Sequence, residues 1–94
     1  PTGELTRADL DMVTELNLVW ARITDEGLKE VVKLTQLRKL ILDNNQITDA
    51  GLKEVAKLRK LSMLSVGGTQ VTKAGVAELR RMFPNAVILS DARK

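Results

Sequence analysis

Apolar residues recur along this chain at a fixed interval of 24 residues. Leu10, Leu34, Leu58 and Met82 follow one another at this interval, which predicts a core position for each of them, and Leu34 and Leu58 are followed three residues later by a further leucine, Leu37 or Leu61. The same interval separates a set of β-branched residues: Ile23, Ile47 and Val71. A constant period of this length is typical of a solenoid, in which each repeat packs only against its neighbours.

Within each unit, one short segment alternates between apolar and polar residues. Leu40 and Leu42 are separated by one residue, which places both side chains on one face of a strand and leaves Lys39, Ile41 and Asp43 on the other. The pattern predicts a strand over residues 38–43. The 24-residue step predicts equivalent strands over residues 14–19 and 62–67.

The segments between the predicted strands have the spacing of a helix. Leu52, Val55 and Ala56 recur at three- and four-residue intervals, which form one apolar stripe. Each such helix is expected to begin at a threonine whose hydroxyl accepts a first-turn N–H, and acidic residues follow two of these caps. The predicted caps are Thr24, Thr48 and Thr72, and a first helix over residues 7–13 would begin at Thr6. Alternating strands and helices indicate an α/β fold with a parallel sheet.

The repeat then resembles a known family. The segment Leu37-x-x-Leu40-x-Leu42-x-x-Asn45-x-Ile47 is similar to the LxxLxLxxNxL pattern of leucine-rich repeats. The helix start Ile/Val-Thr-Asp-x-Gly-Leu resembles repeats common in bacterial proteins and in some eukaryotic substrate-adaptor chains. The latter usually carry cysteine, which this chain lacks.

This resemblance implies an α/β leucine-rich-repeat solenoid with parallel strands on a concave face and helices on a convex face. We expect a single domain over residues 1–94, with about three and a half repeats, an N-terminal cap and first helix within residues 1–13, and a C-terminal cap over residues 83–94. In the family, the asparagine at the position of Asn45 links neighbouring coils. Thr69 could provide that link in part, whereas Ala21 cannot.

Composition excludes several classes of function. The chain has 15 basic and 12 acidic residues in mixed-sign stretches, so no dense basic stripe favours nucleic acid. It has no cysteine and no histidine, which removes the usual metal sites and nucleophile pairs. We therefore expect no enzyme activity, no cofactor and no small-molecule substrate. No apolar run reaches the length of a membrane span, so a soluble chain is expected, with the cytoplasm favoured and the compartment open.

The predicted function is a non-enzymatic protein-interaction module that binds through the concave face. Val19, Ile41 and Met63 interrupt an otherwise polar face, either as an apolar patch for a partner or as ordinary exposed residues. Trp20 either covers the open end of the first coil or anchors an interface. The candidate protein-binding residues are Glu15, Asn17, Val19, Trp20, Lys39, Ile41, Asp43, Met63 and Ser65.

An alternative prediction is a structural, self-assembling scaffold unit, designed or excised from a larger protein. The segment Val87–Leu89 is predicted to form a final strand, whose register stays open because Pro84 precedes it. Its free edge could pair with a second copy of the chain, or it could be protected by charged residues. The candidates for that protection are Asp91, Arg93 and Lys94, and those for covering the front of the core are Leu5, Ala8 and Met12.

Overall fold

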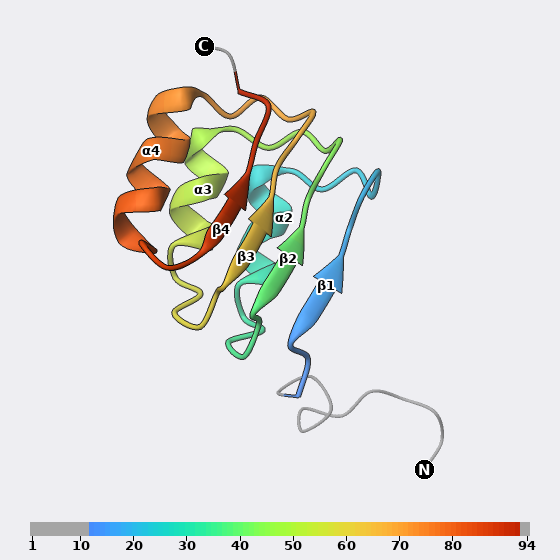
Figure 1. Cartoon of the computed structure of the whole chain (residues 1–94). Helices are drawn as coiled ribbons and strands as arrows, with labels where there is room; N and C mark the ends of the chain where they lie inside the picture. The colour runs from blue at the N-terminus through green and yellow to red at the C-terminus, as the bar shows by residue number, and fades with distance from the viewer. Residues whose placement is uncertain (1–11, 93–94) are drawn as a thin grey trace.

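The computed structural model describes residues 12–92, in which four parallel strands form one sheet in chain order (Figure 1). The strands are β1 (Glu15–Asn17), β2 (Lys39–Ile41), β3 (Met63–Ser65) and β4 (Val87–Leu89). The pairing register advances by the predicted period, since Glu15 lies opposite Lys39, Lys39 opposite Met63, and Met63 opposite Val87. The predicted α/β solenoid is confirmed.

Three helices cover one face of the sheet: α2 (Asp25–Val31), α3 (Asp49–Val55) and α4 (Lys73–Met82) (Figure 1). Each begins after a predicted threonine, whose hydroxyl accepts a hydrogen bond from a first-turn backbone N–H. These caps are confirmed. The helix expected over residues 7–13, and with it Leu5 and Ala8, lies almost entirely outside the described residues, and Met12 is exposed.

The strands are three residues long, which is shorter than predicted. Neighbouring coils nevertheless stay hydrogen-bonded beyond the strand ends, where Leu18 N donates to Ile41 O and Leu42 N donates to Ser65 O. The regular strand therefore ends before the predicted residue because the loop begins to turn there. The backbone groups of neighbouring coils remain hydrogen-bonded beyond that point.

The core lies between the sheet and the helices. The central residue of each of the last three strands points inward and is buried, namely Leu40, Leu64 and Ile88. Leu28, Leu52 and other helix residues meet them from the opposite side. Each fully buried leucine stabilises the fold by about 1.5–3 kcal/mol, so the periodic aliphatic positions account for the architecture.

Asn45 links the first coil to the second. Its side-chain oxygen accepts from Ala21 N (3.1 Å) and Ile23 N (2.9 Å), and its nitrogen donates to Leu18 O (2.7 Å). Thr69, at the equivalent position one coil later, donates to Val66 O within its own coil. The expected side-chain link through Thr69 is therefore wrong, because a hydroxyl is too short to reach the preceding loop and satisfies a carbonyl of its own coil instead.

A second ladder joins the helix starts. The Asp25 carboxylate accepts from both the backbone N–H (2.8 Å) and the hydroxyl of Thr48, and Asp49 binds Thr72 in the same way. A Cβ on Gly51 would lie 2.3 Å from Asp25 Oδ1, and one on Gly75 would lie 2.2 Å from Asp49 Oδ1. Glycine is thus required there so that a carboxylate of the preceding coil can approach.

At the end of α4 the core position moves one residue beyond the 24-residue step, from Met82 to Phe83. The step is restored at β4, where Val87 pairs with Met63. Met82, predicted as a core position, is 55% exposed, and Phe83 packs against the core instead. The turn bond from Ala86 N to Phe83 O matches the one from Leu61 N to Leu58 O. The prediction for Met82 is wrong because α4 has ten residues, whereas α3 has seven.

The outer edge of β4 is partly covered by the chain itself. The Arg80 guanidinium donates to Ile88 O (3.1 Å), a carbonyl that points away from β3. Both carboxylate oxygens of Asp91 accept from Gly68 N. Asp91 therefore fastens the end of the chain to the preceding loop, whereas Arg93 and Lys94 lie outside the described residues.

Candidate functional site

The sheet has one face that the helices do not cover. We call it the open sheet face, formed by the outward-pointing strand residues Glu15, Asn17, Lys39, Ile41, Met63, Ser65, Val87 and Leu89. It is the face that the sequence predicted as concave. Because alternate residues of a strand point to opposite sides, the buried central leucines fix which side chains lie on it.

The half of the open sheet face nearer to β4 is apolar. Val87 is 54% exposed and Leu89 is 47% exposed, and Val87 lies directly opposite Met63 in the register. Ile41 and Met63 are half-buried on the neighbouring strands. Val87 and Leu89 were not among the predicted site residues, because the register that brings them onto this face could not be fixed from the sequence.

The half nearer to β1 is polar. Lys39 Nζ lies 3.9 Å from Glu15 Oε1, and the two side chains are 45% and 69% exposed, so the solvent-screened ion pair is worth about 0–1 kcal/mol. A shallow depression of about 470 Å³ brings Glu15, Asn17 and Lys39 together with Ile41 and Met63. The structure thus groups five of the nine predicted residues at one place.

The other predicted residues lie differently. Ser65 is only 8% exposed and contributes little surface. Asp43 is half-buried after β2, and its Oδ1 is buried without a hydrogen-bond partner among the described residues. Val19 and Trp20 follow β1 and lie at the loop edge of the sheet, where Trp20 is 75% exposed.

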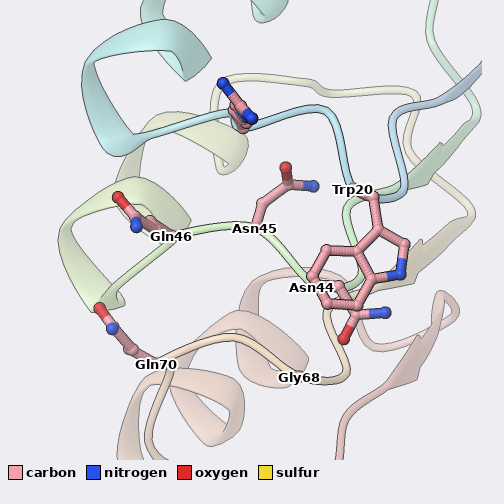
Figure 2. Close-up of a pocket in the computed structure, with 7 residues that line it drawn as sticks. Trp20, Asn44, Asn45, Gln46, Gly68 and Gln70 are labelled. Atoms are coloured by element: carbon pink, nitrogen blue, oxygen red, sulfur yellow. The ribbon is translucent and has the colours of Figure 1, made fainter.

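The loops after the strands form a second surface. We call it the loop rim, formed by Trp20, Arg22, Asn44, Gln46, Gly68 and Gln70, which line a depression of about 680 Å³ together with Asn45 (Figure 2). Of the residues that form the loop rim, only Trp20 is among the predicted binding residues. Gln46 and Gln70, which are one repeat interval apart, and the neighbouring Asn44 were the signal that could have revealed the rest.

The loop rim contains unusual backbone geometry. Asn44 (φ 61°) and Gly68 (φ 68°) adopt the left-handed conformation at equivalent positions, and both residue types tolerate it. Trp20 has the same conformation (φ 56°), as does Arg22 (φ 60°). For a bulky side chain this backbone conformation costs about 1–2 kcal/mol. The conformation is therefore less favourable for Trp20 than for Asn44 and Gly68, which occupy the equivalent positions.

No group of three acidic residues that could hold a metal ion occurs within residues 12–92. No helix in the same range is long and apolar enough to cross a membrane. The open sheet face and the loop rim offer hydrogen bonds, apolar contacts and few charges, which suits recognition.

The comparisons with known proteins agree with the fold. A sequence profile described as Leucine Rich repeat matches residues 12–32 and 33–56. A comparison with curated proteins gave no match.

Proposed function

The chain carries leucine-rich repeats, and on that premise we propose that it is a non-enzymatic protein-interaction module that binds its partner through the open sheet face. Leucine-rich repeats commonly mediate protein–protein interactions, and the family is generally non-enzymatic. The observation that carries the proposal is the contiguous apolar surface of Ile41, Met63, Val87 and Leu89 beside the exposed pair Glu15 and Lys39.

This arrangement has the composition of a recognition surface. Apolar contacts supply most of the binding energy of an interface, and the polar groups beside them set orientation and specificity. Four strands about 4.8 Å apart span only about 14 Å, which is small for the roughly 800 Å² per partner of a standard interface. A partner would therefore also contact the adjacent loops or bind weakly.

The alternative of self-assembly through the edge of β4 has less support. Pairing with a second chain would require the outward backbone groups of Val87–Leu89, and Arg80 already occupies the Ile88 carbonyl. An enzyme has less support still, because the exposed carboxylate of Glu15 lies on an open surface that does not exclude water.

Site-specific photo-crosslinking tests the proposed binding face. A photoreactive phenylalanine analogue is placed at Met63, on the open sheet face, or at Ala77, which is exposed on α4. Both proteins are incubated with an extract of the source cells and irradiated. We expect a discrete crosslinked protein from position 63 that is absent from position 77. Crosslinking that is equal at the two positions, or found only at position 77, would overturn the proposal.

A further inference from the structure

The loop rim displays a strained and exposed aromatic side chain. Trp20 is 75% exposed while its backbone adopts a conformation that tryptophan disfavours. A packing role does not explain this arrangement, because most of the indole touches solvent. The loop imposes this conformation, since Asn44 and Gly68 share it, and a tryptophan at a position that suits asparagine or glycine indicates a role for the exposed side chain. In Figure 2 the indole extends from Trp20 toward Asn44, along the row of equivalent loop positions.

The polar side chains of the loop rim have no hydrogen-bond partner in the described part of the chain. Within residues 12–92, no hydrogen bond is formed by the side chains of Trp20, Arg22, Asn44, Gln46 or Gln70, although the backbones of Trp20, Asn44, Gln46 and Gln70 donate to the neighbouring coil. The side chain of Asn45, in contrast, is committed to the coil linkage. Four of the five free groups are neutral, and no carboxylate lines the depression. Amides both donate and accept, which matches the hydroxyl groups of a neutral ligand.

The spacing of these groups is set by the solenoid. Backbone bonds from Asn44 N to Gly67 O (2.9 Å) and from Gln70 N to Ile47 O (2.9 Å) hold successive loops at about the 4.8 Å separation of neighbouring strands. That distance is close to the length that one pyranose unit adds to a linear glycan. An extended peptide advances about 3.3 Å per residue, so its side chains would fall out of step with the coils.

We propose that the loop rim binds a neutral linear oligosaccharide, a site separate from the open sheet face. The indole of Trp20 stacks on the C–H face of one pyranose ring, which suits its large apolar surface. Asn44, Gln46 and Gln70 exchange hydrogen bonds with the hydroxyls of the following units, and Arg22 donates at the same end as Trp20. A nucleic acid would need several cations to neutralise its phosphates, and the rim has one.

Intrinsic fluorescence provides a direct test, because Trp20 is the sole tryptophan and the chain has no tyrosine. The full chain is titrated with cellohexaose, chitohexaose, maltohexaose and laminarihexaose up to millimolar concentrations. We expect a saturable change in emission with at least one of the four, confirmed by calorimetry. Absence of any saturable response across the panel would overturn the proposal, as would an equal response to the monosaccharides.

Two variants separate binding from folding. Trp20→Asn places a residue that tolerates the left-handed conformation at this position, so we expect sugar binding measured by calorimetry to be lost while Tm rises by a few degrees. Gln70→Ala should weaken binding several-fold with Tm unchanged, and Val87→Glu on the open sheet face should leave sugar binding unaffected. A fall in Tm for Trp20→Asn would show that Trp20 serves to cover the first coil, and would contradict the proposal.

Discussion

At the residue scale, the Thr-Asp-x-Gly segment is a linkage between coils as well as a helix start. Asp49 accepts two hydrogen bonds from Thr72, and the missing Cβ of Gly75 leaves the space that its carboxylate occupies. At Gly27 an added Cβ would meet Ile23 at 3.6 Å, an ordinary contact among the described residues. The glycine of the first helical turn is therefore needed for coil packing at Gly75, whereas among the described residues nothing requires it at Gly27.

We expect Gly75→Ala to lower the free energy of unfolding by about 1–3 kcal/mol, because displacing the carboxylate leaves the Thr72 N–H without its acceptor. Gly27→Ala is the matched control, and it should be neutral or stabilise the helix by up to about 1 kcal/mol. Urea denaturation of the two variants measures both quantities. Equal destabilisation of the two would argue against the ladder.

The residue-scale features were only partly predictable from the sequence. The recurring glycine in the first helical turn was visible in the repeat pattern, and the structure shows at Gly51 and Gly75 that the close stacking of neighbouring coils requires it. The carboxylates that fill the space were not foreseen, because a contact between residues 23 positions apart leaves no local pattern. The left-handed conformation of Trp20 was not predicted either. Asparagine and glycine, at the equivalent positions 44 and 68, are typical of that conformation, whereas tryptophan is not.

At the scale of the elements, β4 is the strand whose outer edge the alternative of self-association would use. Its inner edge pairs with β3, and Arg80 from α4 donates to the outward carbonyl of Ile88. An uncovered strand edge is a template for pairing with another chain. Arg80 therefore gives α4 a second role besides covering the core.

Removing this cover should promote association. We expect Arg80→Ala to raise the native mass above the 10.4 kDa of one chain as concentration increases, measured by light scattering over about a hundredfold range. Arg81→Ala is the matched control, because Arg81 pairs with Glu78 on the exposed side of α4, and it should remain a single chain. Association of both variants, or of neither, would refute the role of Arg80.

The elements themselves followed closely from the periodic pattern. The strand and helix of each coil were predicted because every coil repeats the same apolar positions, and the tertiary structure reinforces that repetition. The end of α4 was not predicted, since the helix continues to Met82 and moves Phe83 into the core. Whether a helix runs on or turns before a proline depends on packing that one sequence does not display.

At the scale of the whole molecule, the solenoid presents an apolar surface on the open sheet face and a polar surface on the loop rim. The two are close but chemically different, because the strands expose Met63, Val87 and Leu89, whereas the loops expose amides and Trp20. Six of the nine candidate residues predicted from the sequence lie on the open sheet face, five of them around its depression, and the register of β4 enlarges that surface. The open sheet face is therefore the surface that we propose for protein recognition.

The most direct measurement is the dissociation constant of the protein crosslinked at position 63, determined by calorimetry for the native chain and for Val87→Glu. Val87 is more than half exposed, so the substitution should preserve the circular dichroism spectrum. We predict a rise in Kd of about tenfold or more, corresponding to about 1.4 kcal/mol, with Ala77→Glu as an unaffected control. An unchanged Kd for Val87→Glu, with the fold intact, would contradict binding through the open sheet face.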